Sequence, residues 1–335
     1  MKTMPSLLAP AGNMRALQTA LRFGADAVYC GAKQYGLRAQ ANNFDEKQLE
    51  EAVRLAHAAG AQVNLTLNIF AFDGDLDGMV RTAQRARDVG LDAAIVSDLG
   101  AIARIAREVP GLDVHVSTQA STTNSESARV YKALGAKRVV LAREMTFEQI
   151  EAMSAAIGDE IELETFIHGA LCMSVSGQCY MSAFLGGRSG NRGGCAGPCR
   201  LPFDASGTPG PAAGHHLSLK DMSVIGHLPQ LSAAGVASVK IEGRLRPPEY
   251  VAAAVNACLL ARAGEPYDTR LLQDVFSRSG FTDGYLTGAR NGSMFGTRTE
   301  GDAAAAKAAA PRLRELYRRE RPRVGVGLEL TLEED

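Results

Sequence analysis

Residues 1–245 alternate short runs rich in Val, Ile and Leu with stretches of helical periodicity. This order predicts an α/β fold of parallel strands joined by crossover helices. The runs show little apolar–polar alternation, as strands covered on both faces do. Eight strands are expected, at 7–9, 27–31, 62–68, 93–97, 114–118, 138–141, 161–167 and 238–241. Eight units predict a closed, TIM-like (β/α)8 barrel, with an open doubly wound sheet as the alternative.

The remaining pattern divides the chain into a barrel and an extension. Helices are expected at 45–59, 76–89, 125–134 and 146–155, several followed by a glycine that suits a helix C-terminus. We expect a barrel domain at 1–263, with a Cys-rich insertion at 168–216 after the seventh strand, and a C-terminal extension at 264–335 that is either complete or the start of a further domain. Within the extension, 324–332 alternates apolar and polar residues and predicts a strand. This strand is expected to pair with 277–298, with a second copy of the chain or with a further domain, and the oligomeric state stays open.

The compartment of the protein decides how its six cysteines are interpreted. Residues 1–10 lack the apolar core of a secretory signal, and no stretch approaches the ~20 apolar residues that cross a bilayer. We therefore expect a cytoplasmic protein without membrane contact, in which disulfides are rare. The net charge of −1 provides no general attraction to nucleic acid, so such a partner requires a local patch.

Four cysteines fall within 28 residues of a glycine-rich segment: Cys172, Cys179, Cys195 and Cys199. This clustering predicts a metal centre rather than four unrelated buried thiols. Structural zinc prefers tight pairs of thiolates, and only the last two are so spaced. An iron–sulfur cluster accepts looser spacing because each iron takes one thiolate, so we expect a cluster, with zinc as the alternative. Cys30 is either a reserve ligand or a core residue.

Polar side chains follow most of the predicted strands. The C-terminal ends of the strands are where a (β/α)8 barrel carries its active site. Taken singly, each of these residues has an ordinary explanation as a helix cap or a loop charge, but their shared location predicts a site. They are Asn68, Asp98, Gln119, Asn124, Arg143, Glu144, His168, Lys240, Glu242 and Arg244.

The segment around the first two cysteines resembles a known family. The run Glu164-x-Phe166-x-x-Gly169-Ala-Leu-Cys172-x4-Gly177-x-Cys179-x-Met-Ser182 matches the signature of the collagenase-like peptidases, peptidase family U32. Similarity extends over most of the chain, from Leu8-Ala-Pro-Ala-Gly-Asn13 to Lys240-Ile-Glu-Gly-Arg244. Residues 275–288 most resemble the branch that hydroxylates a cytidine of ribosomal RNA.

The resemblance implies an enzyme that hydroxylates without molecular oxygen. Members of this family modify RNA pyrimidines or ubiquinone precursors and hold a 4Fe-4S cluster through four cysteines, and prephenate is implicated as the oxygen source for the RNA-modifying members. By position, Cys172, Cys179 and Cys195 match the family's ligands, and the fourth is Cys199 or Cys30. We therefore expect an RNA substrate, rRNA or tRNA, and a prephenate-like donor. A ubiquinone-pathway hydroxylase component and, from the family's name, a peptidase are the alternatives.

Within the hydroxylase hypothesis the strand-end residues divide by chemistry. Imidazole and carboxylate groups suit acid/base work, and guanidinium and ammonium groups suit the two carboxylates of the donor. We expect catalytic roles for His168, Glu242 and Lys240, with Lys240 also a candidate for donor binding, and substrate-binding roles for Gln119, Asn124, Arg143 and Arg244.

Other functions find less support in the sequence. No His-Glu-x-x-His or Gly-x-Ser-x-Gly motif occurs, which leaves a peptidase only Cys172 as nucleophile with His168 as its base. An inactive iron–sulfur scaffold does not explain the polar strand ends. A basic run could contact RNA phosphates, although a solvated helix face with Glu315 and Glu320 explains it slightly better. The run comprises Arg312, Arg314, Arg318, Arg319, Arg321 and Arg323.

Overall fold

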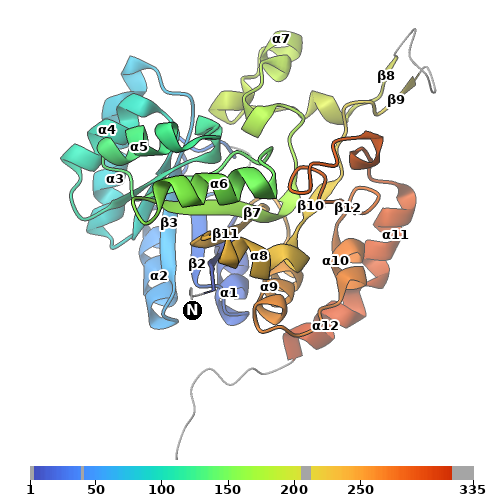
Figure 1. The fold of residues 1–335 in the computed structure, drawn as a ribbon. Helices are drawn as coiled ribbons and strands as arrows, with labels where there is room; N and C mark the ends of the chain where they lie inside the picture. The colour runs from blue at the N-terminus through green and yellow to red at the C-terminus, as the bar shows by residue number, and fades with distance from the viewer. Residues whose placement is uncertain (1–3, 39–40, 205–212, 319–335) are drawn as a thin grey trace, which may run out of the picture.

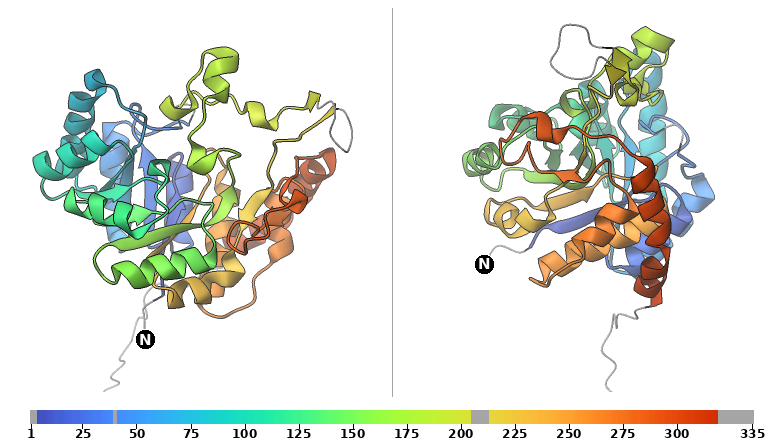
Figure 2. Two further views of the ribbon diagram at one scale, coloured as in Figure 1. Left: turned by 45° about the horizontal axis from the view of Figure 1, so that its top comes forward. Right: turned by 90° about the vertical axis from the view of Figure 1, so that its right-hand side faces the viewer.

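A closed barrel of eight parallel strands forms the centre of the computed structural model, which describes residues 4–38, 41–204 and 213–318 (Figures 1 and 2). β11 pairs with β1 on one side and with β7 on the other, and these pairings close the sheet. All eight predicted strands are present, and the closed barrel, rather than the open sheet, is confirmed. The barrel strands are β1 (Ser6–Pro10), β2 (Ala27–Gly31), β3 (Gln62–Leu67), β4 (Ala93–Val96), β5 (Asp113–Val116), β6 (Arg138–Val140), β7 (Glu162–Ala170) and β11 (Ser238–Ile241).

Helices cover the outside of the barrel (Figure 1). They are α1 (Met14–Arg22), α2 (Glu46–Ala58), α3 (Asp73–Asp88), α4 (Leu99–Glu108), α5 (Ser125–Ala133), α6 (Phe147–Ile157), α8 (Leu228–Ala233) and α9 (Pro248–Arg262). Capping residues set where the helices begin. The side chain of Asp45 accepts a hydrogen bond from the backbone N–H of Gln48, and the side chain of Gln48 accepts one from the backbone N–H of Asp45. α2 therefore begins at Glu46. The four predicted helices are present with ends shifted by at most three residues. None of the helices in the described ranges has both the length and the apolar character needed to cross a bilayer.

The insertion and the extension add smaller elements. They are α7 (Met181–Gly186), β8 (Phe203–Asp204), β9 (Ala213–Gly214), β10 (Asp221–Ser223), α10 (Thr269–Val275), β12 (Phe281–Thr282), α11 (Glu300–Ala308) and α12 (Ala310–Arg318). β10 runs antiparallel to the end of β7, and β12 pairs with β10, so both segments attach to one edge of the barrel. The strand predicted at 324–332 lies outside the described residues.

The interior of the barrel is unusually polar. Side chains alternate along each strand, so that on β1 Leu7 and Ala9 face the helices while Leu8 faces inward. Few apolar side chains face inward. Glu164 is buried inside the barrel and accepts hydrogen bonds from Ser238 (2.9 Å) and Lys240 (3.1 Å). Arg138 Nη1 lies 3.3 Å from the same carboxylate. An ion-paired network therefore fills much of the space below the mouth of the barrel.

Candidate functional site

The four clustered cysteines line one cavity of about 430 Å³ above the C-terminal ends of the barrel strands. Cys172 follows β7 directly, Cys179 precedes α7, and Cys195 and Cys199 lie near a short 3-10 turn at Pro198–Arg200. The segment that carries them rises from the end of β7 and forms the upper part of the molecule in Figure 1. The structure therefore brings together all four thiols that the sequence predicted to act as a group.

The backbone around the thiols suits sulfur anions. The N–H of Met181 donates to Cys179 Sγ (3.4 Å), and the N–H of Gly197 donates to Cys195 Sγ (3.3 Å). Gly197 has a φ of +69°, a conformation that glycine adopts without strain. Burial raises the pKa of the Cys199 thiol, and the other three thiols act in the same direction, whereas the Arg200 charge lowers it. Four thiolates at this spacing would therefore require positive charge among them, which a metal centre provides.

A single ion and a cluster require different spacings of four thiols. Four sulfurs around one zinc lie about 3.8 Å apart, because each Zn–S bond is about 2.3 Å and the geometry is tetrahedral. Among the described residues no group of three or more His, Cys, Asp or Glu side chains is arranged to hold a single metal ion. A cluster places its ligands farther apart, since each thiolate binds a different iron.

Hydrogen bonds of three charged side chains, Glu144, Arg192 and Arg200, anchor the insertion to the barrel. The Glu144 carboxylate accepts hydrogen bonds from the backbone N–H (2.8 Å) and the hydroxyl (2.9 Å) of buried Ser176. On the opposite side, Arg192 donates to Asp75 (2.7 Å) in the first turn of α3. Arg200 donates to backbone carbonyls at the end of β7 and before β10. The thiol-bearing loops are therefore held over the mouth of the barrel on several sides.

A charged cluster forms the boundary between the thiol cavity and the mouth of the barrel. The Glu242 carboxylate accepts hydrogen bonds from Arg38 (3.0 Å) and Arg143 (3.3 Å), and all three residues line both spaces. Although burial raises the pKa of Glu242, the charges of Arg38 and Arg143 outweigh it and hold the pKa at about 2. Glu242 is therefore ionised at neutral pH and orients two guanidinium groups toward the shared space.

Arg244 lies deeper in the mouth and is buried. Its Nη1 has no hydrogen-bond partner among the residues that the structure describes, and neither does Nε of Arg143. A Cβ on Gly31 would lie 2.0 Å from that Nη1, so the guanidinium packs against bare backbone. Burial lowers the pKa of Arg244, and the Arg38 charge adds to this effect. Unpaired buried N–H groups beside a second arginine form a site suited to an anion.

Lys240, Gln119 and Asn124, three further predicted site residues, differ in their access to the mouth of the barrel. Lys240 reaches the floor of the mouth, but its ammonium group is paired with Glu164 and lies 4.5 Å from the centre of the Tyr29 ring. Gln119 lines both spaces, as expected for a substrate-binding residue. Asn124 is exposed and caps α5, with its side chain accepting a hydrogen bond from the backbone N–H of Ser127.

His168 lies outside the lining of both spaces. Its ring stacks on Tyr250 (5.5 Å between centroids) and meets the edge of Phe281 (5.1 Å), and burial lowers its pKa to about 4. Neither ring nitrogen has a hydrogen-bond partner in the described part of the chain, so His168 is not paired with Cys172 there. A peptidase dyad of these two residues has no geometric support.

Arg38 and Cys30 both belong to β2 or to the loop that follows it. Arg38, which the sequence analysis did not identify, belongs to the loop after β2; the only signal was its position at the C-terminal end of a barrel strand. Cys30 faces the helices in the apolar core, where burial raises its pKa to about 12. Cys30 therefore lies apart from the cavity that Cys172, Cys179, Cys195 and Cys199 line.

Comparison with known proteins adds a family and several relatives. The model of peptidase family U32 matches residues 12–294. The tRNA hydroxylation protein P1 of Bacillus subtilis is 39% identical over 261 residues, which cover 75% of this chain and 61% of that protein. The 23S rRNA 5-hydroxycytidine synthase of Escherichia coli is 40% identical over 248 residues, with 73% and 37% covered. An uncharacterized protease of Methanocaldococcus jannaschii is 36% identical over 331 residues, with 90% and 78% covered. The chain thus spans less than two thirds of the length of these two RNA-related proteins.

Proposed function

The chain belongs to peptidase family U32, and from this membership we propose that it is an iron–sulfur enzyme that hydroxylates a pyrimidine base in RNA without molecular oxygen. Its relatives include proteins named for tRNA hydroxylation and for the synthesis of 5-hydroxycytidine in 23S rRNA. Both are longer than the region this chain matches, so activity and substrate are proposed for this chain from its own site.

The observation that carries the proposal is the joining of two chemically different spaces. Four thiols line the upper cavity, and Arg38, Arg143 and Glu242 line both it and the mouth of the barrel. A 4Fe-4S cluster held by the four thiols would supply one-electron chemistry at this position. At about 430 Å³, the cavity falls within the range of roughly 300–1,000 Å³ of small-molecule sites. Enzymes that modify a base take it out of the stack into such a pocket.

The arginines at the mouth suit a prephenate-like donor with two carboxylates. Arg143 and Arg244 both have buried N–H groups without partners among the described residues, and guanidinium groups bind planar carboxylates well. Lys240 is already paired with Glu164, so we assign donor binding to the two arginines. Glu242, with its pKa of about 2, is a weak base; we assign it the positioning of Arg38 and Arg143.

The cysteines provide the first test. Protein purified without oxygen is expected to be brown and to contain about four iron and four sulfide per chain. Replacing any one of Cys172, Cys179, Cys195 and Cys199 with Ala should reduce iron content and hydroxylation together. The matched control is Cys258→Ala, which removes a buried thiol on α9, distant from the cavity, and should leave the iron content unchanged.

The reaction itself is tested on RNA. RNA from cells that lack the protein is incubated with the anaerobic enzyme and prephenate, then digested, and its nucleosides are measured by mass spectrometry. A gain of one oxygen on a pyrimidine nucleoside supports the proposal. Colourless, iron-free protein that hydrolyses peptides at full rate, and loses that activity only on Cys172→Ala, would establish the peptidase alternative instead.

A further inference from the structure

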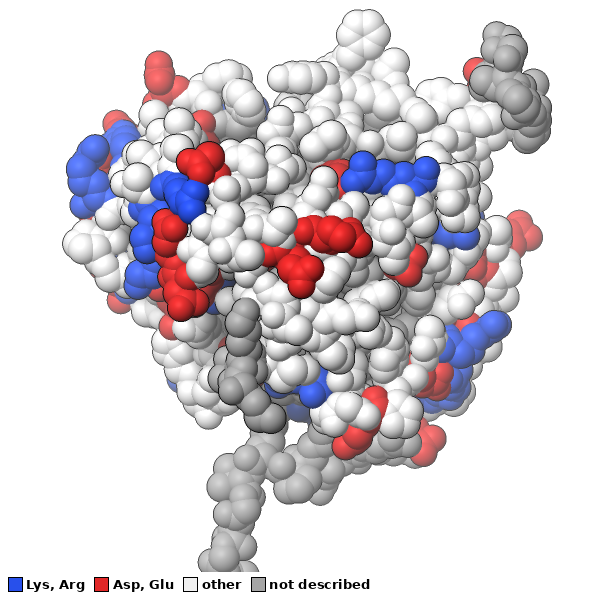
Figure 3. Space-filling view, viewed as in Figure 1, with Lys and Arg blue, Asp and Glu red and all other residues white. Residues whose placement is uncertain are grey.

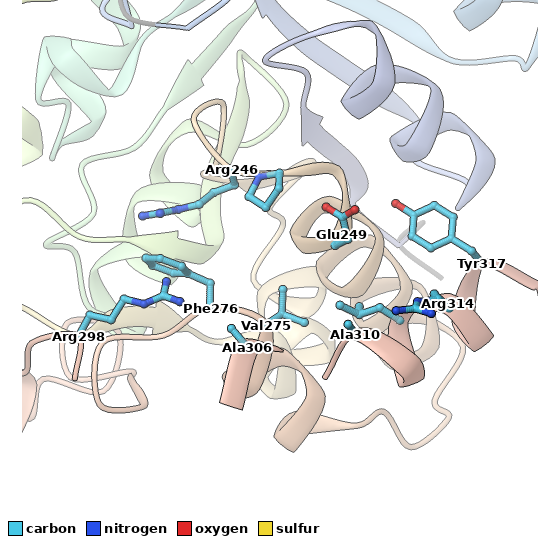
Figure 4. Close-up of a pocket in the computed structure, with 11 residues that line it drawn as sticks. Arg246, Glu249, Val275, Phe276, Arg298, Ala306, Ala310, Arg314 and Tyr317 are labelled. Carbon is cyan, nitrogen blue, oxygen red and sulfur yellow. The ribbon is translucent and has the colours of Figure 1, made fainter. Parts of the chain in front are cut away.

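A second pocket, of about 560 Å³, lies between α9 and the helices of the C-terminal extension (Figure 4). Its wall is largely apolar, and three arginines and one glutamate add charge. It is lined by Arg246, Pro247, Glu249, Val275, Phe276, Arg298, Ala306, Ala310, Leu313, Arg314 and Tyr317. The roles proposed above make no use of this pocket.

Phe276 organises the positive charge of this pocket. The guanidinium carbon of Arg246 lies 3.5 Å from the centre of its ring, and that of Arg298 lies 4.4 Å away. Figure 4 shows the ring between the two guanidinium groups. Arg278 also lies over this ring, at 5.2 Å, but its charge is balanced by Asp221 at 2.6 Å. The aromatic face stabilises the arginines without neutralising them.

The arginines that line the pocket lack counter-ions. In the described ranges no carboxylate lies within salt-bridge distance of Arg246, Arg298 or Arg314. Asp302 lies close enough for the Arg298 charge to contribute to its lowered pKa, but its carboxylate caps α11 through Thr299. Glu249 is the one carboxylate among the residues that line the pocket, and Asp221 acts on Arg246 from outside it. An anion in the pocket would therefore meet more positive than negative charge.

A general electrostatic attraction between the protein surface and anions does not explain the arginines of this pocket. On the face shown in Figure 3, Lys and Arg side chains alternate with Asp and Glu in small groups. The net charge of the chain is −1. Arginines beside an apolar wall are therefore a local feature of this pocket. They match a ligand that combines phosphates with a flat ring whose faces can stack, as a nucleotide does.

We propose that this pocket binds a nucleotide of the RNA substrate next to the base that is modified. Its base would lie against the apolar wall, and the phosphates on either side of it would lie on Arg298 and Arg314, which stand at opposite ends of the pocket (Figure 4). The inference rests on the proposed function. Arg246 connects the two sites, because it lines this pocket and also the thiol cavity. A strand anchored here would therefore run toward the cavity that receives the target base.

The test measures binding of a fluorescein-labelled single-stranded RNA of about ten nucleotides to the iron-loaded protein by anisotropy. Arg298→Ala and Arg314→Ala are each expected to raise Kd roughly tenfold, because a charge-assisted contact is lost. The slope of log Kd against log salt concentration should fall by about 0.7 for each lost phosphate contact. The matched control is Arg270→Ala on α10, which removes an exposed arginine that pairs with Asp274 outside the pocket. The control should leave both Kd and slope unchanged.

The outcomes separate this inference from the proposed function. If wild-type enzyme hydroxylates RNA while both pocket variants keep its KM and Kd, the inference is wrong and the function stands. If the iron-loaded protein neither binds nor hydroxylates RNA, both are wrong. Uridine monophosphate provides a further arm: a Kd for the free nucleotide equal to that for RNA would assign the pocket to a small-molecule ligand and overturn the RNA assignment.

Discussion

Several side chains inside the barrel are charged, although a packed core normally contains few charged groups. Glu164 is nearly inaccessible, yet it is ionised, because Lys240 and Arg138 outweigh the effect of burial and hold its pKa at about 2. Such a network stabilises the fold only while every member is present, since removing one leaves the others buried and unpaired.

Glu164→Gln is therefore expected to lower the free energy of unfolding by roughly 3 kcal/mol at pH 7, because Lys240 and Arg138 lose their buried counter-ion. Urea denaturation monitored by circular dichroism measures this. The control is Glu162→Gln, which removes a carboxylate that also contacts Arg138 but whose side chain is 53% exposed, against 1% for Glu164. The control should cost less than about 1 kcal/mol. Equal losses in both variants would contradict a buried network.

His168 makes the stability depend on pH. Its pKa is about 4 in the folded protein and about 6.5 when unfolded, so the unfolded state binds more protons between these values. Above pH 6.5, neutral His168 contributes about 3 kcal/mol to the free energy of unfolding. This contribution is lost as the pH falls toward 4. His168→Phe should flatten this part of the wild-type profile in urea denaturation. Parallel profiles for wild type and His168→Phe would refute the burial of a neutral imidazole.

Among the elements, the barrel strands were predictable and the insertion was only partly so. The segments 27–31 and 238–241 correspond to β2 and β11 without any shift. The first is a nearly continuous apolar run, as strands buried on both faces have. The second alternates, because Ser238 and Lys240 face the polar interior and Val239 and Ile241 face the helices. β10 was missed because its three residues carry no periodicity and are held by pairing with β7. The sequence identified the four thiols as a group through their proximity in the chain. It could not identify the Arg38–Glu242 pair, which joins residues 204 positions apart.

Anchoring of the insertion can be tested at Glu144. Glu144→Ala removes both hydrogen bonds to Ser176 and should increase local opening of residues 172–200 roughly tenfold, with global stability little changed. Hydrogen exchange with mass spectrometry measures this opening. Glu151→Ala, an exposed carboxylate on α6, should leave exchange in the insertion unchanged. Wild-type protection in Glu144→Ala would mean that the other anchors suffice.

At the scale of the whole molecule, the extension packs back onto the beginning of the barrel. Tyr317 on α12 meets Phe23 edge to face, with 5.4 Å between ring centroids, and its hydroxyl lies 3.3 Å from the hydroxyl of Thr19 on α1. The same helix contributes Leu313 and Arg314 to the second pocket. Packing of α12 on the barrel and the shape of that pocket are therefore coupled.

Tyr317→Ala is expected to destabilise the protein by about 2 kcal/mol, since a half-buried aromatic contact is lost. Tyr317→Phe keeps the ring and should cost less than about 1 kcal/mol. Thermal unfolding of the two variants measures the difference. If both variants melt together with the wild type, α12 contributes nothing to the stability of the barrel.

Closure of the barrel by β11 also bears on how the chain folds as it is synthesised. Ser6 in β1 has Ser238 as its register partner, and Glu164 in β7 pairs with the same residue, so neither β1 nor β7 has its second barrel neighbour until β11 leaves the ribosome. Until then, β1 and β7 would be the unpaired edges of an open sheet, and such edges are sites of aggregation. Expression at lower temperature, with chaperones in excess, should therefore increase the yield of folded protein.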